Sequence, residues 1–249
     1  MPEGPEIRRA ADRVAKAVVG HPLREVTFAF EHLQPFEAPL TTSQVTEVGT
    51  RGKAMLTRFA CGLTVYSHNQ LYGRWMIGAS DSPPRTGRSL RFAIVGPRRA
   101  ARLYSASEID VIVTDDVDDD PRVARLGPDA LDPEVTVEQV AERLRSRTFG
   151  GRQLAALLLD QGFVAGLGNY LRSDILLAAK IHPRRRPREL DPDQQRRLAD
   201  RILVLTRQSY RTGGITNDAE LEAAIVAIAR ERGTGKTLCP SEAAKAVRP

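Results

Sequence analysis

The period of the hydrophobic pattern changes along this chain, and that change restricts the fold more than any other feature. Between residues 23 and 104, short apolar runs alternate with Gly, Pro or Ser, which is typical of strands joined by turns. The predicted strands are Leu23–Phe30, Gln44–Thr50, Ala54–Phe59, Leu63–Ser67, Arg74–Ile77, Leu90–Val95 and Ala101–Tyr104. Because no helical pattern separates them, they predict a β-sandwich and not alternating βαβ units.

Helical periodicity appears before and after these strands. Pro5 suits the first turn of a helix, apolar residues follow at helical spacing, and Gly20 would end the helix as a C-cap. Further helices are predicted at Thr136–Arg145, with Thr136 as the cap, Gln153–Gln161, Tyr170–Ala179 and Asp191–Ser209. The sequence therefore predicts an α+β protein: an N-terminal helix, a β-sandwich domain and an all-α domain.

The stretch Thr114–Pro121 contains five aspartates, and we expect it to be a solvated connector. It separates a predicted catalytic β-sandwich domain at residues 1–113 from a helical domain at 127–217. The linker itself spans 114–126, and an atypical tail spans 218–249. A length of 249 residues is more consistent with two domains than with one.

The composition is that of a soluble protein, and its basic balance suggests a nucleic-acid partner, with a generally arginine-rich proteome as the alternative. The net charge is +6, the sequence pI is about 9.7, and the abundant arginines suit phosphate recognition. No apolar run approaches the ~20 residues of a membrane span. The two cysteines, Cys61 and Cys239, allow neither a disulfide framework nor a four-cysteine zinc site, so we expect a cytoplasmic location.

The chain begins Met1-Pro2-Glu3-Gly4-Pro5-Glu6, a start that is suited to amine chemistry. Removal of the initiator Met would leave Pro2 as a free secondary amine. The pKa of an α-amino group is about 8, against about 10.4 for lysine. A fraction of the amine is therefore unprotonated at neutral pH and can attack an electrophilic carbon. Glu3 and Glu6 lie close enough in the chain to move protons. The alternative is that both glutamates only cap the helix.

Two turns between predicted strands carry candidate residues. Lys53 follows Gly52 and could reach a phosphate or assist the terminal amine; the alternative is an ordinary exposed lysine. In the second turn, Gln70, Leu71 and Tyr72 are consecutive, and such side chains can fill the space left by an extruded base. The alternative there is a buried turn with Leu71 and Tyr72 in the core.

The predicted helical domain offers two further candidates. Gly166-Leu167-Gly168-Asn169 predicts a tight turn before a helix N-terminus, where free N–H groups can hold a phosphate. Asn169 would add a contact, or it would simply cap the helix. The loop His182–Arg188 is basic and too rich in proline to be helical; it could contact a nucleic-acid backbone or only be solvated. Gly233–Thr237 is no P-loop, because Arg230 stands where that motif needs glycine.

Several segments carry a family resemblance together, in one order from roughly residue 2 to 217. They read Pro-Glu-Gly-Pro-Glu from residue 2, Thr-Arg-Gly-Lys at 50–53, Tyr-Ser-His-Asn-Gln-Leu-Tyr-Gly at 66–73, Leu-Tyr-Ser-Ala-Ser at 103–107 and Gly-Leu-Gly-Asn-Tyr-Leu-Arg at 166–172. This set resembles the formamidopyrimidine-DNA glycosylase family. The contiguous Gln70-Leu71-Tyr72 resembles its endonuclease VIII branch.

The resemblance implies a base-excision-repair enzyme that removes oxidised pyrimidines from double-stranded DNA and cleaves the strand at abasic sites. Pro2 would form a Schiff base with the sugar, Glu3 would protonate the opened sugar, and Glu6 would support the site. Lys53 and Asn169 would hold the flanking phosphates, with Asn169 in a helix–two-turns–helix element. The DNA-binding set implied by the resemblance is Gln70, Leu71, Tyr72, Asn169, Arg172 and His68; for His68, a structural role is the alternative.

The C-terminus departs from the family pattern. The family usually ends in a β-hairpin, with or without zinc, that supplies an arginine to the lesion phosphate. Here Asn217–Glu220 predicts a capping box before a helical stripe of Leu221, Ile225 and Ile228, and the segment after Thr237 weakly resembles the beginning of a small uncharacterised bacterial domain. We therefore expect a helical tail without metal ligands, no zinc and no other cofactor.

The missing hairpin leaves alternatives open. One is a protein that binds damaged or abasic DNA with weak or no turnover, unless Arg230, Arg232 or Lys236 replaces the missing arginine. Another is that the apolar stripe of the tail docks a protein partner, although packing on its own domain is the simpler expectation. In every case we expect a monomer.

Overall fold

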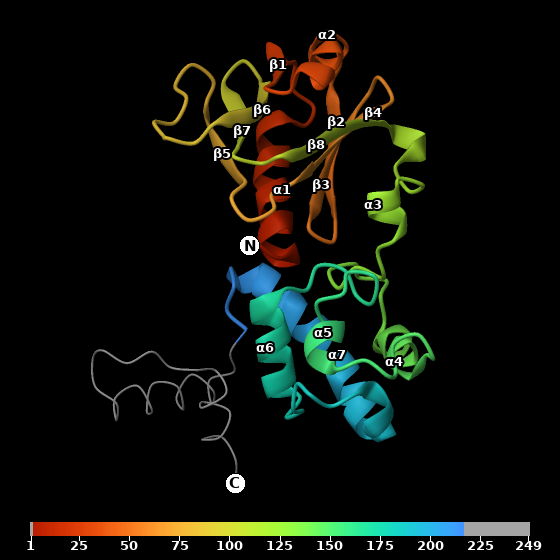
Figure 1. Cartoon of the computed structure of the whole chain (residues 1–249). Helices are drawn as coiled ribbons and strands as arrows, with labels where there is room; N and C mark the ends of the chain where they lie inside the picture. The colour runs from red at the N-terminus through yellow and green to blue at the C-terminus, as the bar shows by residue number, and fades with distance from the viewer. Residues whose placement is uncertain (1, 217–249) are drawn as a thin grey trace, which may run out of the picture. The chain divides into compact units, whose positions relative to one another are not determined.

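The computed structural model describes residues 2–216, which form two compact units divided between Asp129 and Ala130 (Figure 1). Each unit is described by itself. Residues 114–126 group with the first unit. The predicted tail at 218–249, with its stripe from Leu221 to Ile228, lies outside the described residues. No helix within residues 2–216 has the length and apolar character needed to cross a membrane.

The first unit is a β-sandwich with an N-terminal helix, α1 (Gly4–Val18). One antiparallel sheet has the order β1 (Glu25–Phe28), β6 (Leu90–Val95), β7 (Arg99–Tyr104) and β5 (Arg74–Ala79). The other has the order β2 (Val45–Arg51), β3 (Ala54–Phe59), β4 (Leu63–His68) and β8 (Glu108–Val113). Val14 of α1, Met55 of β3 and Phe92 of β6 belong to the same buried core. The predicted α+β architecture is confirmed.

Strand β8 is the one strand of this unit that the hydrophobic pattern does not predict. Its charged residues Glu108 and Asp110 alternate with apolar ones, and it lies at the edge of its sheet, paired with β4 alone. All seven predicted strands are present, and two of them, Ala54–Phe59 and Leu90–Val95, have the predicted bounds. Strands with one buried face and short turns are thus readable from local sequence.

The connection from β1 to β2 contains a 3₁₀ helix, η1 (Glu31–Phe36), and helix α2 (Glu37–Thr41). Both are too short for a helical apolar repeat to reveal them. Helix α2 completes the edge of the sheet. The amide of Val26 donates to Thr41 Oγ1 at 2.8 Å, and that of Phe28 donates to Glu37 Oε1 at 2.6 Å. These side chains satisfy N–H groups that an edge strand would otherwise expose.

The acidic stretch is solvated at its aspartates, as its composition predicts, but it is not a plain loop. It folds into a 3₁₀ turn, η2 (Thr114–Asp116), and a short helix, α3 (Pro121–Ala124). Val117 and Val123 are buried with Leu56 and Tyr66 in a second apolar cluster. The segment is anchored by Val117 among the aspartates and by Val123 after them, which its acidic composition does not indicate.

The second unit is helical, as predicted. Its elements are α4 (Val137–Arg145), α5 (Leu154–Leu157), α6 (Asn169–Ala178), η3 (Pro187–Glu189) and α7 (Pro192–Thr212). Thr136 caps α4 in a capping box with Gln139, and Asp191 caps α7, so both predicted helix starts are confirmed. Helix α7 continues to Thr212 and ends before Gly213, whose φ of 83° is left-handed.

Two expectations for this unit are wrong. Helix α5 ends at Leu157 and not at Gln161, because Asp160 Oδ1 accepts a hydrogen bond from the Gly162 amide at 2.8 Å and forms a turn. The loop His182–Arg188 is also not free of helix, since the single 3₁₀ turn η3 begins at Pro187. Proline tolerates the first position of such a turn because no N–H group is needed there.

Candidate functional site

One end of the sheet β2–β3–β4–β8 gathers the predicted site residues of the first unit. The turn Gly52–Lys53 joins β2 to β3, and the next residue, Ala54, pairs with His68 at the end of β4. His68 in turn pairs with Glu108 at the start of β8. The N-terminal end of α1 lies at the same end of this unit (Figure 1). The strand register alone therefore places Lys53, His68 and Glu108 at one end of the sheet.

The start of α1 fixes Glu3 and Glu6. Glu3 is the N-cap residue and only 3% exposed. Its amide donates to Glu6 Oε2 at 2.9 Å, and the two residues form a capping box. Pro2, which is half-buried, directly precedes this fixed turn. The capping role is therefore present, and it holds the chain next to Pro2 in one conformation.

Lys53 faces Glu3 and is not an ordinary exposed lysine. Its side chain is half-buried, and burial lowers its pKa below that of a free lysine, while the nearby Glu3 carboxylate opposes the shift. The Glu3 carboxylate, next to Pro2 in the chain, therefore lies within electrostatic range of the Lys53 ammonium. Such a pair can hold a phosphate and move a proton within one site.

A pH profile tests the role of Lys53. We expect turnover on lesion DNA to be retained below the pKa of Lys53 and to fall as the pH rises through it, because the ammonium is then lost. This fall should occur at lower pH than an ordinary lysine would give. Lys53→Arg should move the fall to higher pH, since guanidinium stays protonated. An unchanged kcat/KM profile in Lys53→Arg would contradict the assignment.

Asp129 is a site residue that sequence reasoning missed. Its Oδ2 atom accepts a hydrogen bond from the buried amide of Gly52 at 2.7 Å, and Gly52 has a left-handed φ of 59°. Asp129 thus fixes the turn that presents Lys53. No sequence signal could have found this contact, because 77 positions separate the two residues.

Removing this acceptor should destabilise the first unit. We expect Asp129→Ala to lower the free energy of unfolding by about 1–3 kcal/mol, because the Gly52 amide stays buried without its partner. Asp129→Asn keeps an acceptor oxygen and should lose less. Urea denaturation of both variants measures the difference. Equal losses would show that the hydrogen bond to Gly52 is not the cause.

The turn between β4 and β5 exposes Leu71 and Tyr72, two of the side chains predicted to fill the space left by an extruded base. Leu71 is 59% and Tyr72 68% exposed, so the alternative that both belong to the core is wrong. Gly73 closes the turn: a Cβ atom there would lie 2.4 Å from the carbonyl oxygen of Asn69. The turn therefore needs glycine at this position and presents two large apolar side chains to solvent.

His68 lies under this turn. Burial lowers its pKa, while Glu108 opposes the shift, so the ring is neutral at neutral pH. Its Nδ1 atom then accepts a hydrogen bond from the Gln70 amide at 3.3 Å. The alternative that His68 is structural has this direct support, and contact with DNA stays a prediction.

In the second unit, the helix start predicted to hold phosphate is present. Gly166 has a left-handed φ of 96°, and Gly168, not Asn169, is the N-cap of α6. The suggestion that Asn169 caps the helix is therefore wrong. Asn169 is exposed at the first helical position, and Arg172 follows one turn later on the same face. Both can contact a ligand at this helix start.

Gln161 supports this turn and was also missed. Its Nε2 atom donates to the carbonyl oxygens of Leu159 and Leu167, at 2.9 and 3.0 Å, and its Oε1 atom accepts from the Gly166 amide at 3.1 Å. One side chain thus satisfies three backbone groups of the loop before α6. A glutamine among leucines gives no sequence signal for this role.

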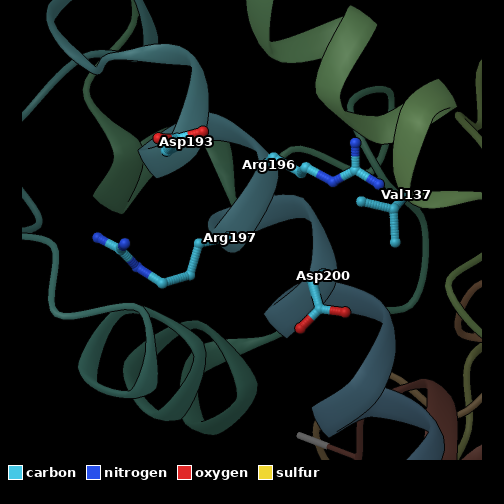
Figure 2. Close-up of a pocket in the computed structure, with 5 residues that line it drawn as sticks. All are labelled: Val137, Asp193, Arg196, Arg197 and Asp200. Carbon is cyan, nitrogen blue, oxygen red and sulfur yellow. The ribbon is translucent and has the colours of Figure 1, made fainter.

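A pocket of about 300 Å³ lies elsewhere in the second unit (Figure 2). Asp193, Arg196, Arg197 and Asp200 follow one face of α7, and Val137 comes from α4. Arg196 pairs with Glu138 at 3.0 Å, and Arg197 Nε donates to the carbonyl oxygen of Ala179 at 3.1 Å. Because these arginines have structural partners and the charges are mixed, we assign the pocket no ligand.

Family comparisons agree with this arrangement. Residues 1–104 match the formamidopyrimidine-DNA glycosylase N-terminal domain, and residues 126–220 match the H2TH domain of the same glycosylase. The chain belongs to the formamidopyrimidine-DNA glycosylase family. Its members are DNA glycosylases and abasic-site lyases of base excision repair. Residues 218–249 match DUF3253, a protein of unknown function.

Individual relatives support the endonuclease VIII branch. Endonuclease 8 of Klebsiella pneumoniae is 48% identical over 225 residues, and that of Escherichia coli is 45% identical; both alignments cover 90% of this chain and 86% of the relative. A solved complex of Lactococcus lactis Fpg with DNA containing an abasic site has a TM-score of 0.74 at 21% identity. It covers 86% of this chain and 80% of that one.

Proposed function

We propose that this family member removes oxidised pyrimidines from double-stranded DNA and cleaves the strand at the resulting abasic site. The observation that carries the proposal is the buried Glu3, fixed next to Pro2 by the capping box and within electrostatic range of the half-buried Lys53. A buried carboxylate, a half-buried ammonium and an α-amine at one end of the β-sandwich provide the groups that amine-based base excision requires.

The reaction begins at the nitrogen of Pro2. Its lone pair attacks C1′ of the damaged nucleotide, and the glycosidic bond breaks with its electrons going to the base, which takes up the proton that the attacking amine releases. The nitrogen lone pair then opens the C1′–O4′ bond to give a Schiff base, and Glu3 in its acid form protonates the ring oxygen. Proton removal from the sugar then breaks the strand by elimination. Glu6 keeps Glu3 in place through the backbone contact at 2.9 Å.

DNA contacts are assigned to both units. Leu71 and Tyr72 occupy the space left by the extruded nucleotide, which their exposure supports, and Gln70 lines that space from the base of the turn. Asn169 and Arg172 contact the backbone at the start of α6, and His68 lies next to the duplex. The relatives solved with abasic-site DNA support duplex DNA as the partner.

No cofactor enters this proposal. Within residues 2–216, no group of three or more His, Cys, Asp or Glu residues could hold a metal ion. Cys61 is exposed and free, and Cys239 lies outside the described residues. The donors of the described chain therefore do not fit a zinc site, and the absence of zinc in the whole chain stays a prediction. We further propose a monomer in the cytoplasm.

Borohydride trapping tests the function directly. The purified protein is incubated with duplex DNA that contains an abasic site, and borohydride reduces any Schiff base to a stable adduct. We expect an adduct, together with multiple turnover on duplex DNA that contains an oxidised pyrimidine. Terminal sequencing must confirm that Met1 is removed. An adduct without turnover would favour the alternative, a protein that binds damage with weak or no turnover; no adduct would contradict the amine chemistry.

A further inference from the structure

The turn Gln70–Tyr72 has an anchored base and an exposed tip. Leu71 and Tyr72 are 59% and 68% exposed, whereas Gln70 is half-buried. Gln70 also has a left-handed φ of 52°, a conformation that costs free energy for any residue with a side chain. Contacts elsewhere in the unit must therefore hold Gln70 in place.

Two residues at the start of β8 supply these contacts. Ser107 Oγ donates to Gln70 Oε1 at 2.5 Å, and Gln70 Nε2 donates to Glu108 Oε2 at 3.5 Å. Both ends of the side-chain amide are thus engaged. The arrangement is possible because Glu108 pairs with His68, two residues before Gln70.

Glu108 is itself held in position. Its Oε1 atom accepts a hydrogen bond from the Tyr66 hydroxyl at 3.4 Å. Tyr66 is buried, and the Arg122 guanidinium lies 4.4 Å from the centre of its ring. The support under Gln70 therefore reaches into the packed outer face of the sheet.

We propose that Ser107 and Glu108 are positioning residues that fix Gln70 and thereby preset the Leu71–Tyr72 tip for insertion into the lesion-bearing duplex. This inference rests on the proposed function. The anchored amide stays on the protein while the tip enters the DNA. A preset tip inserts faster than a flexible one, because less conformational freedom is lost on binding.

Stopped-flow fluorescence tests the proposal. The probe is a duplex that carries a tetrahydrofuran abasic analogue opposite 2-aminopurine, whose emission rises when the tip disrupts stacking. We expect Ser107→Ala to slow this rise about 3- to 10-fold, because the variant loses one hydrogen bond to Gln70. Ser107→Thr keeps the hydroxyl and should restore the rate. Ser82→Ala, in the exposed loop between β5 and β6, is the matched control and should insert normally.

A double-mutant cycle separates positioning from a general effect on the fold. If Ser107 acts through Gln70, Ser107→Ala should add no further slowing in a Gln70→Ala background. Full additivity, or a normal rate in the single variant, would overturn the proposal. Faster insertion in Ser107→Ala would overturn it too, because it would mean that Gln70 must be released.

Borohydride trapping of the same variants separates a failure of the proposed function from a failure of the positioning role of Ser107. At saturating protein, the endpoint yield of adduct with abasic duplex should be unchanged in Ser107→Ala, because the amine is untouched. If the unmodified protein itself gives no adduct, the proposed function fails, while the insertion rates still decide the role of Ser107. If Ser107→Ala alone loses adduct at saturation, a preset tip does not explain its role, and the inference fails.

Discussion

A chain that keeps an uncleaved residue ahead of Pro2 should form no borohydride-trapped adduct, and its turnover on lesion DNA should fall at least about 10³-fold. The extra residue turns the proline nitrogen into a tertiary amide, whose lone pair is delocalised into the carbonyl group. Glu3, Lys53 and the exposed tip remain in place, so DNA binding should survive. Trapping yield and single-turnover rate measure the effect.

The matched control is the same extended chain after a protease has cleaved directly before Pro2. It should regain both adduct and turnover, which separates the amine from any damage caused by the extension. Pro2→Gly keeps a primary amine and should give an intermediate result. Equal trapping before and after cleavage would contradict Pro2 as the nucleophile and would direct attention to the neighbouring Lys53, whose pKa is lowered by burial.

The elements of the fold that could be predicted are those specified by local sequence. Turn residues and one-sided apolar runs predict the strands, and Thr136 and Asp191 mark the starts of α4 and α7 by hydrogen bonds within the first turn. Elements that depend on distant partners could not be predicted. Strand β8 exists because β4 pairs with it, and Glu37 of α2 accepts a hydrogen bond from the edge strand β1.

The candidate site also contains residues that the sequence reveals and residues that only the structure reveals. The terminal amine and the turn at Lys53 are visible in the sequence as short motifs. Asp129, Glu108 and Gln161 are not, because each acts through hydrogen bonds to a turn that no short motif encodes. Ordinary charged and amide residues carry no sequence signal for such roles.

Composition alone could not decide between an exposed and a buried tip of the β4–β5 turn. Large apolar residues such as Leu71 and Tyr72 are usually buried, which favours the core alternative on composition. Here the close approach of Gly73 to the backbone of Asn69 and the anchored amide of Gln70 force both side chains outward. An exposed apolar pair held by such a turn indicates a binding surface.

Glu3→Gln should reduce turnover on lesion DNA by about 10²- to 10⁴-fold, the usual contribution of a positioned proton donor. Glutamine has nearly the same shape as glutamate, so it should preserve the start of α1 and leave DNA binding intact. Only the ability to transfer a proton and the negative charge are lost. Single-turnover rates and equilibrium binding, measured on the same lesion duplex, separate these two effects.

The pH dependence of activity provides a second test of Glu3→Gln. The Glu3 carboxylate raises the pKa of Lys53 against the effect of burial, so removal of the charge should lower that pKa further. Because the proposed site needs the ammonium form, the residual activity of Glu3→Gln should be lost at lower pH than that of the unmodified protein. An alkaline fall at the same pH in both proteins would show that the Glu3 carboxylate does not act on Lys53.

Glu6→Gln is the matched control for Glu3→Gln. Its side-chain oxygen can still accept the hydrogen bond from the Glu3 amide, which Glu6 Oε2 accepts at 2.9 Å, so the backbone next to Pro2 should keep its conformation. We expect turnover to change only a few-fold, since one charge-assisted hydrogen bond becomes a neutral one. If Glu6→Gln were as slow as Glu3→Gln, the proton donor would be the pair and not Glu3. If neither variant were slowed, the sugar would receive its proton from another group.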